Sequence, residues 1–272
     1  HGRIYGRGSA DDKGPAIAAL YAMKAVKELG IPLARGARLI LGSDEECGSS
    51  DLRYYYSKET EAPMSFTPDA DFPLIHLEKG YLNKTFEASF PACEALPRIL
   101  SVDGGQKVNV VPGKAKAVVE GVLEDLLAAA AKETEESLHV QIQWTEMGNK
   151  TEIEVKGASA HASTPQQGIN AVTALLVLLQ KLPFAPCEGV EKLNQMLELF
   201  PHGETDGASL GVKMEDDISG ALTMNLGVFH FDETHLTGTF DSRIPGCGSD
   251  DTMTKVVEKS LEEKGFSVEK GT

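Results

Sequence analysis

The sequence is short of cysteine, of basic charge and of long apolar runs, and each shortage excludes a class of protein. Its four cysteines (Cys47, Cys93, Cys187 and Cys247) lie far apart in the chain and form no Cys-x-x-Cys pair. A disulfide framework or a zinc–thiolate site is therefore not expected. We interpret the cysteines as free thiols of a reducing, cytoplasmic compartment.

Lysine and arginine number 26 against 41 aspartates and glutamates, which gives a formal net charge of -15. An acidic surface of this kind repels phosphate backbones, so nucleic acid is not an expected partner. The longest apolar run, residues 171–179, stops at Gln180 and Lys181, well below the roughly 20 residues that a membrane-spanning helix needs. We interpret it as a buried helix and expect no membrane partner.

What the sequence does contain is the composition of a soluble globular protein. Hydrophobic residues make up 41% of the 272 residues and charged residues 25%, which is enough apolar material for a core. This length suits two modest domains. Before Gly80, Pro15 begins an Ala-rich helix over residues 16–29 that Gly30 ends, and a strand is predicted over residues 37–41. That alternation is typical of a sheet covered by helices.

From Gly80 onward the pattern predicts an α+β domain with an antiparallel sheet. The expected strands are 81–89, 115–120, 139–144, 151–156, 221–230 and 235–243, with a hairpin turn at 147–149, and the expected helices are 123–132, 168–182 and 250–264. Residues 184–215, which Pro and Gly punctuate, are either a short helix with loops or a mobile segment.

Three acidic clusters stand out near the start of the chain, at residues 6–15 (GRGSADDKGP), 42–48 (GSDEECG) and 66–73 (FTPDADFP). Each alone has an ordinary interpretation: aspartates that cap a helix, glutamates in a solvated turn, and a Thr-Pro-Asp turn. Together they predict carboxylates gathered at loops that leave a sheet, where a pair of divalent cations would neutralise their repulsion.

In order and spacing these clusters, with Glu78-Lys79-Gly80 after them, resemble the co-catalytic zinc peptidase superfamily that includes aminoacylases, acetylornithine deacetylase and succinyl-diaminopimelate desuccinylase. The resemblance is closest to its PepV-type dipeptidases. It implies an α/β protein, with a zinc-peptidase-like α/β/α catalytic domain, incomplete here, over residues 1–80 and an α+β lid domain containing antiparallel sheets over residues 81–272.

The resemblance also implies roles for the acidic residues. Asp11 would bridge two zinc ions, with a cis peptide bond after it. Glu46 would ligate one zinc and Asp69 the other, while Glu45 would be the general base. Manganese or cobalt could replace zinc in such a carboxylate-rich site. An aspartate at position 69 favours the dipeptidase branch of the superfamily over the deacylases.

Three residues of the second domain match lid motifs of the same family. His161, within residues 156–165 (KGASAHASTP), would donate a hydrogen bond to the oxyanion of the tetrahedral intermediate. Asn109 would bind the substrate or the intermediate, and Arg243 would grip the C-terminal carboxylate of a dipeptide. The alternatives are an inert loop histidine, a turn asparagine and a surface arginine. The other histidines match no motif, and we interpret them as structural.

The family also carries a His-x-Asp motif ahead of the first cluster and a zinc-ligating histidine near its C-terminus, and neither occurs here. We therefore expect this chain to be a fragment that is inactive alone and poorly folded in its first eighty residues. The intact protein is expected to be a monomer, as the PepV-type enzymes that it resembles are.

The function expected of the intact protein is zinc-dependent hydrolysis of unblocked dipeptides. The alternatives are an N-acyl amino acid deacylase of the same superfamily and a non-catalytic binding relative. The sequence does not define the side-chain preference of the substrate.

Overall fold

A computed structural model describes residues 2–45, 48–69 and 73–269. The chain divides into two compact units, His1–His76 and Leu77–Thr272, and each is described by itself. Within the described ranges, no helix is both long and apolar enough to cross a lipid bilayer. Whether the two units are a catalytic part and a lid stays a prediction.

The first unit contains two helices, α1 (Lys13–Glu28) and α2 (Ser50–Tyr56). Helix α1 is rich in alanine, the best helix former, and the chain leaves it through Gly30 at a φ of 64°. None of the side chains described in this unit is buried. The strand predicted over residues 37–41 is not formed. A strand needs a hydrogen-bonded neighbour, and the described residues of this unit supply none.

The second unit is built on an eight-stranded sheet in the order β10-β1-β9-β8-β2-β3-β5-β4. All of its strand pairs are antiparallel, which confirms the predicted mixed α/β fold with an antiparallel sheet. Its strands are β1 (Gly80–Ser89), β2 (Arg98–Gly104), β3 (Lys114–Glu120), β4 (Gln141–Met147), β5 (Lys150–Lys156), β8 (Thr223–Phe231), β9 (His235–Ile244) and β10 (Ser267–Val268), and β6 (Glu215–Asp216) pairs separately with β7 (Gly220–Ala221).

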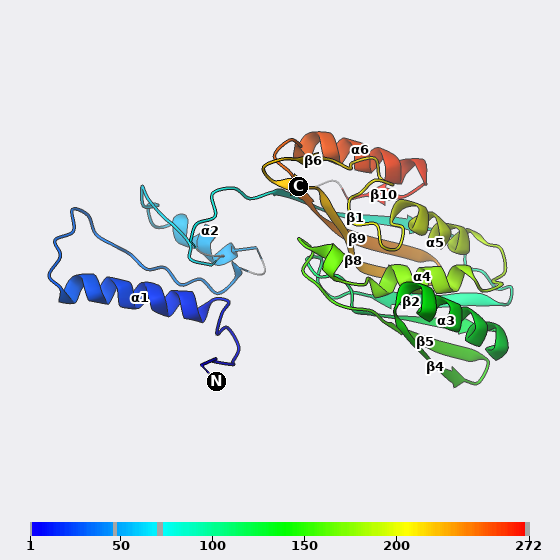
Figure 1. Cartoon of the computed structure of the whole chain (residues 1–272). Coiled ribbons are helices and arrows are strands. Elements are labelled where there is room, and N and C mark those ends of the chain that lie inside the picture. The colour runs from blue at the N-terminus through cyan, green and yellow to red at the C-terminus, as the bar shows by residue number, and fades with distance from the viewer. Residues whose placement is uncertain (1, 46–47, 70–72, 270–272) are drawn as a thin grey trace. The chain divides into compact units, whose positions relative to one another are not determined.

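Helices cover one face of this sheet (Figure 1). They are α3 (Glu124–Leu138), α4 (Ala171–Gln180), α5 (Glu188–Leu199) and α6 (Asp250–Glu263), with a 3-10 turn, η2, at Pro165–Gln167. Alternate residues of β1, among them Leu82, Phe86 and Ala88, are buried beneath them. Phe86 stacks on Phe200 with ring centroids 5.7 Å apart and meets Phe266 edge-on at 5.6 Å. The core of the chain lies between this sheet face and the helices.

Strand β2 pairs with only one half of β8, and a loop lies beside the other half. The two strands pair only between Val102↔Phe231 and Gly104↔Phe229. Beyond that point the chain turns at Gly105, where φ is 81° and a Cβ atom would lie 1.9 Å from the carbonyl oxygen of Gly227. A Cβ on Gly227 would in turn lie 2.3 Å from the carbonyl oxygen of Val108. Glycine at both positions therefore lets the loop after β2 press against β8.

Candidate active site

Two loops of the second unit are joined backbone to backbone, and they carry two of the predicted site residues. Val110 and His161 form an antiparallel bridge. The Ala162 N–H donates to the carbonyl of Asn109 at 2.9 Å, and the Val111 N–H donates to the carbonyl of Ala160 at 2.9 Å. Asn109, half-buried, and His161, exposed, are therefore neighbours in space although 52 residues separate them in the sequence.

Side chains of strand β8 donate hydrogen bonds to both loops. The Asn225 amide donates to the carbonyl of Val110 at 3.2 Å, and the Thr223 hydroxyl makes a long bond of 3.5 Å to the carbonyl of Ala162. In the ladder of β8 and β9, Thr223 lies opposite Arg243 and Asn225 opposite Asp241. The segments that carry Asn109, His161 and Arg243 thus meet at one end of β8 and β9.

Arg243 is held by a buried carboxylate. Its Nε donates to Asp241 Oδ1 at 2.9 Å and its Nη2 to Asp241 Oδ2 at 3.2 Å, while Asp241 is only 1% exposed. The guanidinium also lies over the ring of Tyr81, 5.9 Å from its centroid. The contact with Asp241 uses two of the five N–H donors of the guanidinium, so the fork can still bind a second anion with the others.

The hydrogen bonds of His161 define its tautomer. The Ser163 backbone N–H donates to His161 Nδ1 at 3.2 Å, and the Ser163 hydroxyl lies 2.7 Å from the same atom. A nitrogen that accepts an N–H bond carries no proton, so the proton of the neutral ring lies on Nε2. His161 can therefore donate a hydrogen bond from Nε2.

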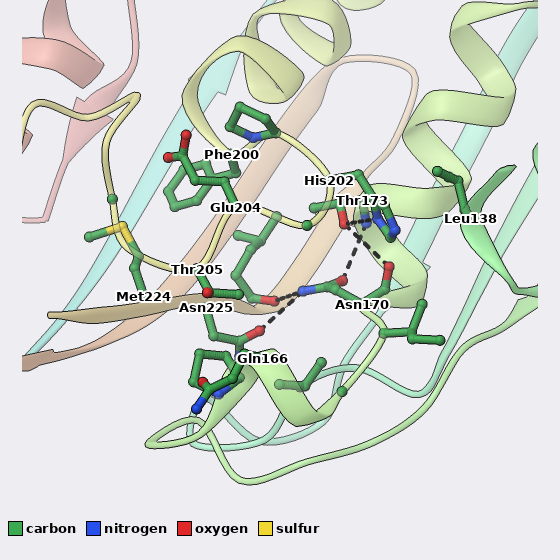
Figure 2. Close-up of a pocket in the computed structure, with 18 of the residues that line it drawn as sticks. Leu138, Gln166, Asn170, Thr173, Phe200, His202, Glu204, Thr205, Met224 and Asn225 are labelled. Carbon is green, nitrogen blue, oxygen red and sulfur yellow. Dashed lines mark hydrogen bonds between the residues drawn. The ribbon is translucent and has the colours of Figure 1, made fainter. Parts of the chain in front are cut away.

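A cavity of about 300 Å³ adjoins these loops through Val111 and Gln166. Figure 2 shows Asn170, Thr173 and His202 linked by hydrogen bonds at its wall. The Thr173 hydroxyl donates to the carbonyl of Asn170 at 3.2 Å and lies 2.8 Å from His202 Nδ1. Burial lowers the pKa of His202, so its ring is neutral at pH 7. Asn170 and Thr173 both belong to the start of α4, whereas His202 follows α5, so no spacing in the sequence indicates its place in this cluster.

The acidic residues predicted as metal ligands and base belong to the first unit. Asp11 is exposed at the end of a turn closed by a 2.8 Å bond from Lys13 N–H to the carbonyl of Gly8, and the predicted cis peptide bond is present between Asp11 and Asp12. Glu45 is exposed and its carbonyl accepts from Gly48 N–H at 3.2 Å. Asp69 is also exposed. Glu46 lies outside the described residues.

The described residues alone do not make a metal centre. Asp11 and Asp69 offer carboxylate oxygens, which zinc accepts as ligands. However, no group of three or more His, Cys, Asp or Glu within the described ranges is close enough to hold a metal ion. The zinc-ligand assignments for Asp11, Glu46 and Asp69 therefore stay predictions.

Comparison with known proteins identifies the class to which the chain belongs. Residues 1–270 match the model of peptidase family M20/M25/M40. Because this match covers nearly the whole sequence, the chain belongs to that family. The family is generally metal-dependent.

Individual relatives narrow the comparison. The chain is 34% identical over 235 residues to the "Putative dipeptidase YtjP" of Bacillus subtilis (strain 168), covering 86% of this chain and 50% of the relative. It is 31% identical over 263 residues to the Beta-Ala-Xaa dipeptidase of Lactobacillus delbrueckii subsp. lactis, covering 94% and 54%. The chain thus spans about half the length of these curated relatives.

One solved structure shows a weaker likeness. It is the crystal structure of aminoacylhistidine dipeptidase from Vibrio alginolyticus, with a TM-score of 0.31 and 11% identity over 71% of this chain and 43% of that chain.

Proposed function

We propose that the whole protein is a zinc-dependent dipeptidase that hydrolyses the peptide bond of unblocked dipeptides. Membership of peptidase family M20/M25/M40 and the names of its relatives support a peptidase of short substrates. The observation that carries the proposal is the meeting of the Asn109, His161 and Arg243 segments at one end of β8 and β9. In this proposal the amide of Asn109, an imidazole N–H donor of His161 and the guanidinium of Arg243 would act on one small ligand.

In this proposal Arg243 binds the C-terminal carboxylate of the dipeptide. A planar guanidinium suits a carboxylate because it can donate two parallel hydrogen bonds. Asp241, almost fully buried, holds the guanidinium from the other side. A site built to pair with this carboxylate would bind substrates that lack it weakly, because the arginine would then be left without its anion.

His161 and Asn109 are proposed to act on the carbonyl of the scissile bond. An imidazole that donates from Nε2 would stabilise the negative oxygen of a tetrahedral intermediate more than the uncharged carbonyl of the substrate. The amide of Asn109 could donate a hydrogen bond beside it. Backbone hydrogen bonds join the two loops that carry these residues. The backbone beneath the two donors would therefore need little rearrangement during the reaction.

The acidic residues of the first unit complete the proposal. Asp11, Glu46 and Asp69 would hold two zinc ions, or manganese or cobalt in their place, and the metals would supply a polarised carbonyl and an acidified water. Glu45 would accept a proton from that water and pass it to the leaving amine. We further propose that the protein acts as a cytoplasmic monomer, as the PepV resemblance and the free thiols suggest.

Three substrates separate this function from its rivals: a free dipeptide, the same dipeptide as its C-terminal amide, and an N-acetyl amino acid. The whole protein, loaded with zinc, is expected to hydrolyse the free dipeptide and to discriminate against the amide. Faster hydrolysis of the N-acetyl amino acid would instead establish a deacylase. No hydrolysis of any of the three and no bound metal would favour a non-catalytic binding protein.

A further inference from the structure

Two cysteines far apart in the sequence lie on segments of the second unit that pack together. Cys93 belongs to the loop between β1 and β2, and Cys187 is the N-cap residue of α5. The Ala185 N–H donates to the carbonyl of Pro97 at 2.8 Å, which ties the two segments together. A Cβ atom on Gly189, in the first turn of α5, would lie 3.0 Å from the ring of Phe90.

These contacts place Cys93 and Cys187 in one neighbourhood of the fold, and the Cys93 thiol acts on the Cys187 thiol. Both side chains are partly buried and neither forms a disulfide. Burial raises the pKa of the Cys187 thiol, and the adjacent Cys93 thiol raises it further, whereas the backbone N–H groups of Val190 and Gly189 lower it. These N–H groups oppose the effect of burial, but the pKa of the Cys187 thiol stays raised, so alkaline pH is needed to form its thiolate.

We propose that Cys93 and Cys187 form a dithiol modification site, which a low-molecular-weight disulfide such as oxidised glutathione converts to an intrachain disulfide. The cross-link would join the loop after β1 to the start of α5. It goes beyond the proposed hydrolysis, because neither cysteine belongs to the Asn109, His161 and Arg243 cluster or to the acidic motifs. The bond is reversible, so a reducing compartment returns the pair to its free thiols.

The exchange proceeds in two steps. The thiolate of one cysteine attacks a sulfur of oxidised glutathione, so a protein–glutathione mixed disulfide forms and one glutathione thiolate leaves. The second cysteine loses its proton and attacks the protein sulfur of that mixed disulfide, which releases the second glutathione. The two protein thiols are oxidised by two electrons, and one oxidised glutathione becomes two reduced molecules.

The test uses the full chain with Cys47 and Cys247 both replaced by serine, so that only the pair remains. After incubation with oxidised glutathione at mildly alkaline pH, trypsin digestion without reductant is followed by mass spectrometry. Cleavage after Lys84, Arg98, Lys181 and Lys192 places Cys93 in peptide 85–98 and Cys187 in peptide 182–192. We expect these two peptides joined by a disulfide, formed at least about tenfold faster in the native chain than in denaturant, because folding raises the effective concentration of the thiols.

Matched variants identify each sulfur. Adding Cys93→Ser or Cys187→Ser to this background should abolish the cross-link and leave the remaining cysteine as a stable glutathione adduct. The proposal is overturned if the native two-cysteine chain accumulates separate glutathione adducts on both peptides. It is also overturned if the cross-link forms no faster in the native chain than in denaturant, since the thiols would then not be neighbours in the fold.

Discussion

At the scale of single residues, Asp241 stabilises the orientation of Arg243 through two charge-assisted hydrogen bonds from a nearly inaccessible position. Replacing it as Asp241→Asn should leave the guanidinium in place but poorly oriented. Losing one such bond costs about 1.5–3 kcal/mol of interaction free energy. We therefore expect KM for a free dipeptide to rise about tenfold or more while kcat changes little. Steady-state kinetics of the whole protein measure both constants.

The C-terminal amide of the same dipeptide is the control substrate, since it lacks the carboxylate that Arg243 is proposed to bind. Its KM should hardly respond to Asp241→Asn. The exposed Asp217→Asn is the control variant, because Asp217 lies on the surface of the same unit. An equal rise in KM for the dipeptide and its amide would show that Asp241 acts only through the stability of the sheet.

Some residue-level features follow from the sequence and others do not. The cis peptide bond after Asp11 is confirmed. It could be predicted because residues 6–15 match a family motif over many consecutive positions, and such a match extends to the local backbone. The roles of Asp11, Glu45, Asp69, Asn109, His161 and Arg243 stay predictions. The contact of Asp241 with Arg243 and the link from His202 to Thr173 were not predicted from the sequence. The His202 link joins elements that meet only in the folded chain, so no local pattern marks it. Asp241 and Arg243 are two residues apart on β9, and the two-residue period of a strand, which puts them on one face, is the signal that could have indicated their contact.

At the scale of elements, Asn170 does two things at the start of α4. Its side-chain oxygen accepts from the N–H groups of Val172 at 3.0 Å and Thr173 at 3.3 Å, and its amide donates to Asn225 Oδ1 at 3.1 Å and to the carbonyl of Leu226 at 2.9 Å. Asn170→Ala removes a helix cap and two part-buried hydrogen bonds to β8. We expect it to lower the free energy of unfolding by about 2–3 kcal/mol.

Ser249→Ala is the matched comparison, because Ser249 caps α6 through Thr252 N–H at 3.3 Å. Its loss should cost only about 1 kcal/mol. Urea denaturation followed by circular dichroism measures both variants. If Asn170→Ala proves no more destabilising than Ser249→Ala, the bonds from Asn170 to β8 contribute nothing to stability.

Most elements of the second unit were predictable because alternation and helical periodicity are local signals. Residues 184–215 are resolved in favour of the helix alternative, as α5, and the helix expected at 168–182 begins at Ala171 because Asn170 caps it. Strand β2 was missed because a register shift between Ile99 and Ser101 breaks its alternation. The strand expected at 37–41 was wrong because pairing depends on neighbours that the local sequence does not contain.

At the scale of the whole chain, the two units differ in how much they bury. The described core residues all belong to the second unit, whereas the described side chains of the first are at least partly exposed, including Ile4, Tyr5 and Phe66 at 88%, 83% and 88%. A segment with few buried contacts opens at low free-energy cost. Limited proteolysis should therefore cut residues 2–76 first and leave a product that begins near Leu77.

Mass spectrometry of the early products tests this expectation. Early cuts within the sheet of the second unit, with the first unit still intact, would contradict it. Proteolysis of this 272-residue chain needs no catalytic activity, so the outcome is independent of catalysis.

The central claim is that carboxylates of the first unit support metal-dependent hydrolysis, with Glu45 moving the proton. The most direct test is the turnover of a free dipeptide by Glu45→Gln in the whole protein, with bound metal measured on the same sample. We predict that kcat falls by about 10²–10⁴-fold while the metal content is unchanged. Turnover equal to that of the unsubstituted protein at the same metal content would contradict the account.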